Sequence, residues 1–221
     1  MKFRSSPTER EHLLERALRL YAGDYVADRV LRLGPAAFAL GVDGIPLTAM
    51  CVELVPSSAA NAFRGELQGF FSEYLSTISN AAVEEGGMLD SFLGEVVIAC
   101  WGLDGKLGRE EKACRAAQKI RWGMKGLLKK FDLDAALGIG ISSGNAHIGN
   151  VGSEQRLKFA VVGDVPNAAS KLAVVGLETS RMVVLDATTA SGLRGDLRAL
   201  VHPFARSLPA ATSSQYFYLA E

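Results

Sequence analysis

The stretch from Gly138 to Leu172 constrains the fold more than any other part of the chain. It reads GIGISSGNAHIGNVGSEQRLKFAVVGDVPNAASKL. Short alternating apolar runs predict two strands, with a turn at Ser143–Gly144 and a Gly-rich loop over Gly149–Ser153. Val-Val-Gly-Asp then opens a helix over Asn-Ala-Ala-Ser-Lys-Leu. Strands, a loop and a helix start in so short a segment indicate a functional site, and the other segments are interpreted as its support.

Length and charge exclude several function classes. The 221 residues suffice for one sizeable domain and an extension, and 24 basic residues balance 24 acidic ones. Without a Lys/Arg block, we expect no nucleic-acid partner. No apolar run approaches the ~18 residues of a spanning helix, and the charged first residues do not resemble a signal peptide, so we expect no membrane insertion. The three cysteines lack CxxC spacing, which favours reduced thiols in a soluble, cytoplasmic protein.

The first 40 residues are predicted to form a helical lead-in, followed by one domain over residues 41–221. Leu13, Leu14, Ala17, Leu18 and Tyr21 share helical spacing, which predicts a helix over residues 8–22 that stops at Gly23. A second short helix is expected over residues 24–33. The apolar stripe either packs onto the domain or forms a dimer contact.

The domain itself is predicted to be α+β. We expect strands at 47–54, 88–92, 96–101, 181–186, 197–204 and 215–219. One helix is expected from Phe63 to about Val83, with Ser58 or Asn61 as its N-cap. Two further helices are expected at 109–130 and at 187–193. With the strands of the opening stretch, the first six elements follow the order β-α-β-β-α-β. That order is the ferredoxin-like arrangement, in which two helices cover one face of an antiparallel sheet, here with additional C-terminal strands.

A basic stripe lies on the predicted helix at 109–130. It resembles a membrane-surface or calmodulin-type stripe, but a solvated outer face on a core-packed helix is the favoured interpretation, because Gly123 and Gly126 make it a poor free helix. The members of the stripe are Lys119, Arg121, Lys125, Lys129 and Lys130.

Common catalytic motifs do not match. The chain has no GxxxxGK[ST] phosphate loop, and the glycines after Gly138 lack dinucleotide-binding spacing. The histidines His12, His147 and His202 lack metal-ligand spacing, and His147 is expected at or near the surface.

Three blocks together resemble the catalytic domain of class III nucleotidyl cyclases, the adenylate and guanylate cyclase family. They are LTAMCVELVPSS (47–58), GGMLDSFLGEVVIACWG (86–102) and LGIGISSGNAHIGNVGSEQRLKFAVVGDVPNAASKL (137–172). The third block is specific, the second moderately so, and the first is weak alone. The GGDEF-type diguanylate cyclases are disfavoured, because Met-Leu-Asp follows Gly86-Gly87.

The resemblance implies a ferredoxin-like palm and a definite chemistry. In this family the ribose 3′-hydroxyl of ATP or GTP attacks the α-phosphorus and releases pyrophosphate. Two divalent ions, Mg²⁺ or Mn²⁺, are held by two aspartates. The site lies between two head-to-tail protomers, a residue pair reads the base, and an Asn-Arg pair stabilises the transition state.

Five of the six family positions differ in this chain. The two metal aspartates align with Glu53 and Glu95, and the base-reading pair aligns with Ser91 and Ala160. In the transition-state pair, the asparagine is kept as Asn167 and the arginine is replaced by Lys171.

These replacements predict a cyclase-homology domain with little or no cyclase activity. It would dimerise, bind ATP or GTP in one version of the hypothesis, and transmit a signal to a sensor or effector protein. The alternative is a divergent, Mn²⁺-dependent cyclase with Glu53 and Glu95 as metal ligands. In a hybrid of the two, the chain pairs with an intact cyclase and supplies half a site.

Overall fold

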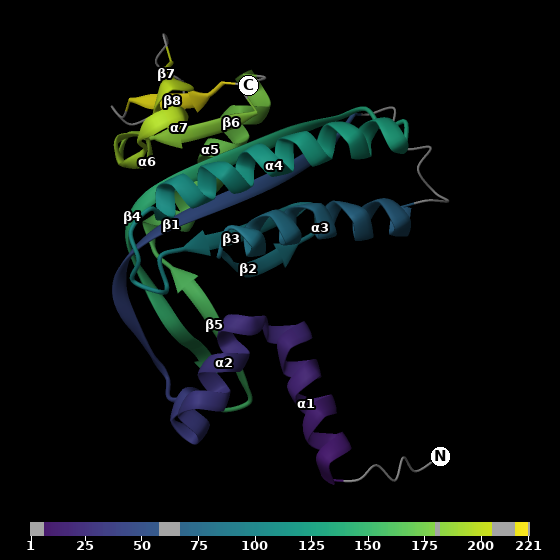
Figure 1. The fold of residues 1–221 in the computed structure, drawn as a ribbon, viewed down its shortest axis with the longest axis vertical. Helices are drawn as coiled ribbons and strands as arrows, with labels where there is room; N and C mark the ends of the chain where they lie inside the picture. The colour runs from purple at the N-terminus through teal and green to yellow at the C-terminus, as the bar shows by residue number, and fades with distance from the viewer. Residues whose placement is uncertain (1–6, 58–66, 180–181, 205–214, 221) are drawn as a thin grey trace. The chain divides into compact units, whose positions relative to one another are not determined.

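A computed structural model describes residues 7–57, 67–179, 182–204 and 215–220. The elements follow in this order (Figure 1): α1 (Pro7–Ala22), α2 (Asp24–Leu33), the 3-10 helix η1 (Gly34–Phe38), β1 (Gly41–Pro56), α3 (Leu67–Glu84), β2 (Met88–Leu93), β3 (Val96–Trp101), α4 (Arg109–Lys130), β4 (Ala135–Ser153), β5 (Arg156–Val162), α5 (Asp164–Thr179), β6 (Val183–Asp186), α6 (Ala187–Gly192), α7 (Gly195–Ala199), β7 (Val201–Pro203) and β8 (Tyr216–Leu219).

The described strands form one mixed sheet in the order β2-β3-β1-β4-β6-β8-β7, and β5 pairs with β4. The β1–β3 and β2–β3 pairs are antiparallel, whereas β4 and β6 run parallel. Segments β1 to β4 with α3 and α4 therefore give the predicted β-α-β-β-α-β order. The α+β prediction is confirmed.

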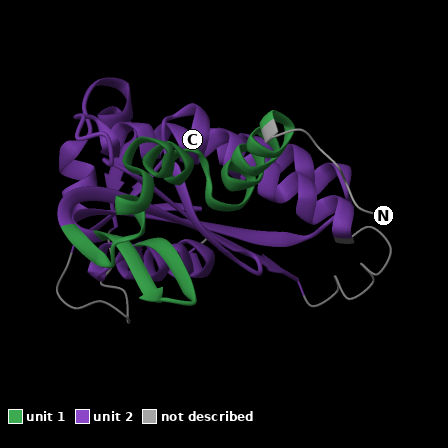
Figure 2. Cartoon of the chain, turned by 90° about the horizontal axis from the view of Figure 1, so that it is seen from below, with its two compact units in different colours: residues 1–43, 148–160 green, residues 44–147, 161–221 purple. Residues whose placement is uncertain are grey.

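The chain divides into two compact units, coloured separately in Figure 2. One comprises residues 1–43 and 148–160, and the other comprises residues 44–147 and 161–221.

The larger unit is built around a sheet with helices on both faces. Helices α3 and α4 lie side by side on one face (Figure 1), and their buried side chains join those of β1, β3, β4 and β6 in one core. Phe70, Tyr74 and Trp101 are among its largest fully buried side chains. Burial of the Phe70 side chain contributes roughly 1.5–3 kcal/mol. On β6, Val183 and Leu185 belong to this core while Val184 contacts Leu172 and Val175 of α5, so α5 covers the opposite face.

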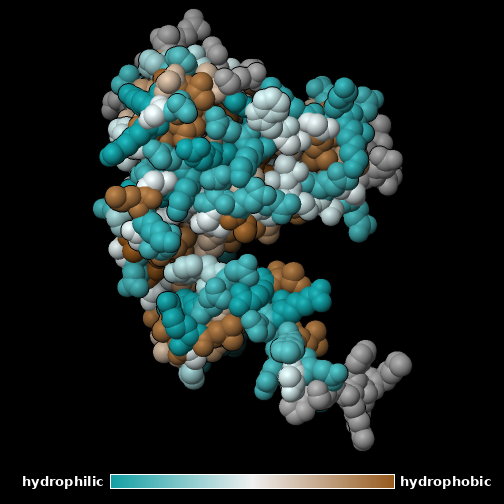
Figure 3. Space-filling view, in the orientation of Figure 1, coloured by the Kyte–Doolittle hydropathy of each residue, from teal (hydrophilic) through white to brown (hydrophobic). Residues whose placement is uncertain are grey.

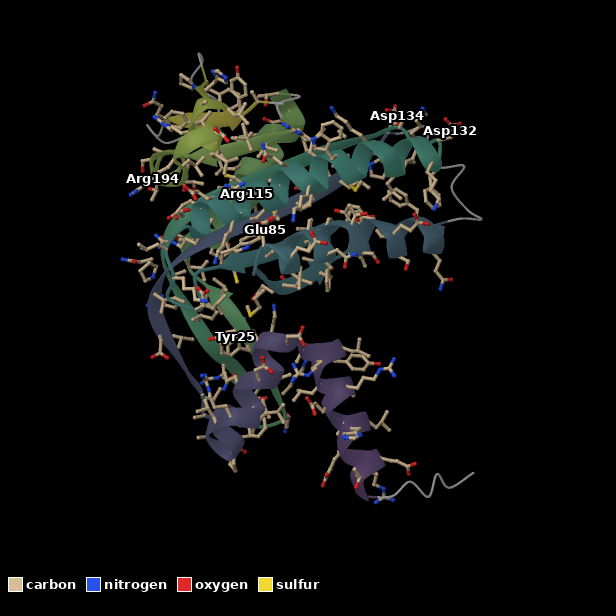
Figure 4. The ribbon with its side chains drawn as sticks, in the orientation of Figure 1. Tyr25, Glu85, Arg115, Asp132, Asp134 and Arg194 are labelled. Carbon is tan, nitrogen blue, oxygen red and sulfur yellow. The ribbon has the colours of Figure 1, made fainter. Side chains whose placement is uncertain are left out.

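In the smaller unit, the lead-in helices pack together and against β5. Arg19 of α1 forms ion pairs with Asp24 and Asp28 of α2. The ring of Tyr25, labelled in Figure 4, lies 5.5 Å from that of Phe159 in β5. This contact lies within the smaller unit, so whether the apolar stripe of α1 packs onto the domain or forms a dimer contact stays a prediction.

Several sequence predictions match closely. Helix α1 ends one residue before Gly23, and α4 has the predicted bounds, Arg109–Lys130. The β2–β3 hairpin turns at residues 94–95, and His147 is exposed. The predicted start of the helix at 63–83, with its caps Ser58 and Asn61, lies outside the described residues.

The predicted turn at Ser143–Gly144 and the loop at Gly149–Ser153 are both wrong, because β4 continues through them to Ser153. A methyl group at Gly149 would overlap the main chain of Gly41. Gly149 therefore allows the main chain of Gly41 to approach β4 closely, and it does not form a turn.

The predicted strand at 197–204 is also only partly right. Residues 195–199 form helix α7, and β7 is limited to Val201–Pro203. Leu197 reaches the core from helix α7, and just beyond β7 the Phe204 amide donates to the Tyr216 carbonyl (3.0 Å).

Arg121 does not belong to a solvated stripe. It is 5% exposed, and its Nη1 donates to the main-chain carbonyls of Leu219 (3.3 Å) and Ala220 (3.1 Å). The other four basic residues of the stripe are exposed. Among them, Lys119 pairs with Glu84 and Glu85.

Candidate functional site

The strand register places two of the predicted site residues on one face of the sheet. Cys51 of β1 and Ser91 of β2 both pair with Ile98 of β3, and Glu53 pairs with Val96. Paired residues of neighbouring strands point to the same side, and residues two apart on a strand do so as well. Cys51, Glu53 and Ser91 therefore share one face, hereafter the site face, which is opposite the core formed with α3 and α4.

Glu95 lies at the turn of the β2–β3 hairpin, next to the end of β1. Its main-chain carbonyl accepts hydrogen bonds from the Leu54 amide (3.4 Å) and the Tyr74 hydroxyl (2.6 Å). Burial raises the pKa of Tyr74 above its usual value, and the nearby Cys51, Glu95 and Glu53 raise it further. The main chains of the two predicted metal ligands are thus adjacent across two strands, with Glu53 half-buried and Glu95 exposed.

A pair of carboxylates fits a divalent ion that takes its other ligands from water and substrate phosphates. Mg²⁺ is commonly bound in this way, through one or two carboxylates. Within the described ranges, no group of three or more His, Cys, Asp and Glu side chains could form a protein-only metal cage. Glu53 and Glu95 are the residues that would hold such an ion.

Helix α5 presents the predicted transition-state pair. Asn167 and Lys171 are four residues apart, so they lie on the same side of the helix, and both are exposed. Between them, the Ser170 hydroxyl donates to the Pro166 carbonyl within the helix (3.1 Å). Burial raises the pKa of Cys51, and the nearby Ser170 side chain partly offsets this shift. The Ser170 contact brings α5 against the site face, two residues from Glu53.

Glycines of β4 make this approach of α5 possible. A methyl group at Gly138 would overlap the carbonyl oxygen of Ala173, and one at Gly140 would overlap that of Ala169. Gly138 and Gly140 therefore lie at the contact between β4 and α5, since only glycine leaves room for the α5 main chain.

The base-reading positions are occupied differently from the expected pair. Ala160 is buried in β5 and has no polar side-chain group. Ser91 donates its hydroxyl hydrogen to Oδ2 of Asp90 (3.0 Å), and Oδ1 of Asp90 accepts a hydrogen bond from the Val161 amide (2.9 Å).

The sequence interpretation missed Asp90. The sequence offered one indication of it, since Asp90 is an acidic residue directly before Ser91, an expected base-reading position. Its position depends on a β-bulge, since the β2–β3 register shifts between Leu89 and Ser91. A register shift of this kind cannot be deduced from residue types.

With this geometry described, comparison with known proteins supports a cyclase fold. No protein-family model matches the chain. Adenylate cyclase 1 of Rhizobium meliloti is 29% identical over 137 residues, which cover 57% of this chain and 20% of that protein. An adenylate cyclase of Anabaena cylindrica is 29% identical over 119 residues, covering 48% and 22%. An uncharacterised protein of Mycobacterium tuberculosis is 29% identical over 101 residues, covering 46% and 18%. The chain thus spans about a fifth of the length of these relatives.

Solved structures give the same result for the fold. A bacterial light-regulated adenylyl cyclase aligns with a TM-score of 0.79 at 16% identity, covering 96% of this chain and 62% of that one. The adenylyl cyclase CyaB from P. aeruginosa aligns with a TM-score of 0.66 at 19% identity, covering 82% and 97%. The guanylate cyclase domain of RhGC from Catenaria anguillulae aligns with 0.63 at 14% identity, covering 80% and 98%.

The chain therefore has the fold of class III nucleotidyl cyclase catalytic domains, and its sequence relatives include adenylate cyclases. The resemblance inferred from the three sequence blocks is confirmed. None of the helices in the described ranges has both the length and the apolar composition needed to cross a bilayer.

Proposed function

We propose that the chain is a cyclase-homology domain of cyclic-nucleotide signalling that acts by dimerisation and has little or no cyclase activity. One observation supports this most: the scaffold glycines, the hairpin and α5 persist, while five of six catalytic positions hold other residues. We place the domain in the cytoplasm, because its three cysteines are buried free thiols.

The residues at the two metal positions keep the negative charge of the family's aspartates, but their side chains are longer. Each glutamate places its carboxylate one methylene farther from the main chain than an aspartate. Mg²⁺ requires near-ideal octahedral geometry at about 2.0–2.1 Å from each ligand. Misplacement by ~1 Å can cost about a hundredfold in rate. Glu53 and Glu95 would thus retain an ion without aligning the attack.

Base recognition and transition-state stabilisation are weakened as well. Ala160 can form no side-chain hydrogen bond to a base. Lys171 retains a positive charge but lacks the planar fork with which arginine binds two phosphate oxygens at once. Ordinary base selection and transition-state stabilisation would both be reduced.

We also propose a head-to-tail homodimer. A guanylyl cyclase domain of the same fold from Blastocladiella emersonii forms a non-canonical dimer, and a double mutant of it is monomeric, so the head-to-tail arrangement comes from the family resemblance alone. On α1, Leu13, Leu14 and Tyr21 are 65%, 68% and 94% exposed, and Figure 3 shows hydrophobic surface over the lead-in helices. Exposed apolar side chains grouped on a helix are typical of an interaction surface. A sensor or effector protein would then detect the state of the dimer.

The alternative function is a working, Mn²⁺-dependent cyclase that converts ATP or GTP into the cyclic monophosphate and pyrophosphate. It is favoured by one observation, the retention of two carboxylates on adjacent strands near the Asn167 helix. In that case Glu53 and Glu95 hold the ions, and Lys171 neutralises the developing phosphate charge.

A product assay separates the two functions. The purified chain is incubated with Mn²⁺ and ATP or GTP, and cyclic nucleotide is measured against a protein-free blank. We expect no product above the blank. Product that disappears in Glu53→Ala and persists in Glu84→Ala, a surface carboxylate paired with Lys119, would establish the alternative.

Dimerisation is tested separately by sedimentation velocity over a concentration series. We expect the dimer fraction to rise with concentration and to fall in a Leu13→Glu/Tyr21→Glu variant. A monomer at every concentration would contradict the proposed dimer.

A further inference from the structure

The main-chain carbonyl of Glu95 joins three elements: α3, β1 and the β2–β3 hairpin. It accepts a hydrogen bond from the Tyr74 hydroxyl at 2.6 Å and another from the Leu54 amide at 3.4 Å. An O–H···O bond is usually about 2.5–3.0 Å long and an N–H···O bond about 2.7–3.2 Å. The Tyr74 bond is therefore the stronger of the two, and it holds Glu95 more firmly than the Leu54 bond does.

The Tyr74 hydroxyl has a fixed position, because the ring that carries it is locked in the core. The side chain is fully buried. Its ring stacks on that of Phe70, with centroids 6.0 Å apart, and lies edge-on to that of Phe71 at 6.2 Å. A buried tyrosine hydroxyl usually finds a hydrogen-bond partner, and the Glu95 carbonyl is that partner here.

The hydroxyl also lies near both predicted metal ligands. Burial is the main cause that raises the pKa of Tyr74, and the charges of Cys51, Glu95 and Glu53 add to it. The phenol therefore stays protonated at neutral pH and remains a donor. Leu54, the second donor to the Glu95 carbonyl, directly follows Glu53 on β1. The carbonyl of one predicted ligand is thus bonded to the neighbour of the other.

We infer that Tyr74 is a positioning residue for a divalent ion held by Glu53 and Glu95. Its hydroxyl holds the Glu95 main chain against the end of β1 and so sets the relative position of two carboxylates that it does not itself bind. This inference rests on the part of the proposed function in which the two glutamates retain an ion. It deepens that proposal by giving a core residue of α3 a role in metal affinity.

The place of the hairpin in the sheet explains why this bond matters. Strand β2 comes last in the order of the described strands, and Glu95 is exposed at the hairpin turn. Without the Tyr74 hydroxyl, only the longer of the two bonds, from Leu54, joins the Glu95 carbonyl to its neighbours. Loss of a hydrogen-bond partner that orients a metal ligand commonly costs about 10–100-fold in metal affinity. A looser turn should therefore weaken ion binding.

The coordination geometry of the ion distinguishes positioning from a general loss of structure. Mg²⁺ demands near-ideal octahedral coordination at about 2.0–2.1 Å, whereas Ca²⁺ accepts flexible coordination at about 2.3–2.6 Å. A displaced Glu95 carboxylate should therefore weaken Mg²⁺ binding more than Ca²⁺ binding. Partial unfolding would lower both affinities in the same proportion.

The test is a Mn²⁺ titration followed by electron paramagnetic resonance, in which free Mn²⁺ gives a sharp signal that bound Mn²⁺ lacks. Mg²⁺ or Ca²⁺ is then added to displace the bound Mn²⁺, which gives the affinity of each ion. No nucleotide is present, so the result does not depend on turnover. In Tyr74→Phe, which keeps the ring, we expect the Mn²⁺ and Mg²⁺ affinities to fall by about tenfold and the Ca²⁺ affinity by less than about threefold.

Ile78→Val is the matched control, because Ile78 is also fully buried on α3, four residues after Tyr74. It trims the core without removing a hydrogen bond, so it should lower the thermal midpoint by a similar amount and leave all three affinities unchanged. Glu53→Gln and Glu95→Gln each remove a carboxylate and should weaken Mn²⁺ binding at least as much as Tyr74→Phe does.

A second measurement covers the case in which Tyr74→Phe is too unstable for titration. Saturating Mn²⁺ raises the thermal midpoint of a protein that binds it only when folded. This rise should be smaller in Tyr74→Phe than in Ile78→Val. An equal rise in the two variants would contradict the role of Tyr74.

The remaining outcomes separate this inference from the proposed function. Unchanged affinities in Tyr74→Phe, the same loss in Ile78→Val, or equal losses for Mg²⁺ and Ca²⁺ would overturn positioning by Tyr74. No Mn²⁺ binding by the unmodified chain, or binding that Glu53→Gln leaves unchanged, would overturn the ion site and this inference with it, but the dimerising function would stand. Conversely, a monomer in sedimentation would contradict the dimer and leave the role of Tyr74 unaffected.

Discussion

The hydroxyl of Tyr74 donates a hydrogen bond of 2.6 Å to the main-chain carbonyl of Glu95, which ties α3 to the turn of the β2–β3 hairpin. Tyr74 is itself fully buried. Tyr74→Phe keeps the ring and removes this bond, so the free energy of unfolding should fall by about 1 kcal/mol. Urea unfolding at pH 7 measures the change.

Tyr21→Phe is the matched control, because the Tyr21 side chain is 94% exposed. It should leave the free energy of unfolding within about 0.5 kcal/mol of the original. Equal stability of the two variants would show that the Tyr74 bond does not hold the hairpin.

Some of the site could be predicted from residue types, and some could not. The positions of Glu53, Glu95 and Asn167 followed from motif alignment, and the structure places them on the expected strand, turn and helix. The hydrogen bond between Asp90 and the Val161 amide could not be predicted, because it depends on a register shift in β2 and joins residues 71 apart in the chain. Local patterns do not encode such a contact.

The packing of α5 onto β4 gives a second prediction. A methyl group at Gly140 would overlap the Ala169 carbonyl, so Gly140→Ala must displace the helix that carries Asn167 and Lys171. Overpacking of this kind typically costs about 1–3 kcal/mol. The free energy of unfolding from urea titration should fall by that amount.

Gly126 provides the control, since a methyl group there meets nothing within 4 Å in helix α4. Gly126→Ala should stabilise the protein by about 0.5–1 kcal/mol through helix propensity. Equal effects of the two substitutions would contradict the close contact between α5 and β4.

Arg121 shows why burial of a charged side chain is hard to predict. It falls among lysines on a helix, and the pattern indicates a solvated face. The structure shows it bonded to two carbonyls at the end of β8, a contact across about 100 residues that no local pattern reveals. By contrast, the bounds of α4 were predictable, because they depend on periodicity within the helix.

Arg121→Met should therefore destabilise the fold. The substitution leaves the carbonyls of Leu219 and Ala220 without their donor, and an unsatisfied buried group costs about 1–3 kcal/mol. The exposed Lys129→Met variant should change the free energy of unfolding by less than about 0.5 kcal/mol. Thermal unfolding of both variants measures this, and indistinguishable midpoints would contradict a structural role for Arg121.

Burial of Cys114 predicts a loss of stability in alkali. Burial raises the pKa of its thiol from 9.0 to about 12, with smaller contributions from Glu110 and Glu111. The unfolded chain therefore releases this proton at lower pH than the folded one, so the stabilising effect is complete below pH 9 and is lost as the pH rises toward 12. Between pH 9 and 11, the free energy of unfolding should fall less steeply in Cys114→Ala than in the unmodified chain. Parallel pH profiles would contradict the shift.

Restoring the family's residues tests whether the replacements limit catalysis. The variant carries five changes together: Glu53→Asp, Glu95→Asp, Ser91→Lys, Ala160→Asp and Lys171→Arg. Shorter carboxylates would allow octahedral metal geometry, the new pair would read adenine, and arginine would bind two phosphate oxygens at once. With Mn²⁺ and ATP, product should exceed that of the unmodified chain by about tenfold or more. Adding Asn167→Ala to this variant should abolish the gain while leaving the dimer fraction unchanged in sedimentation. A folded, dimeric five-site variant that forms no product would show that something other than these positions prevents turnover.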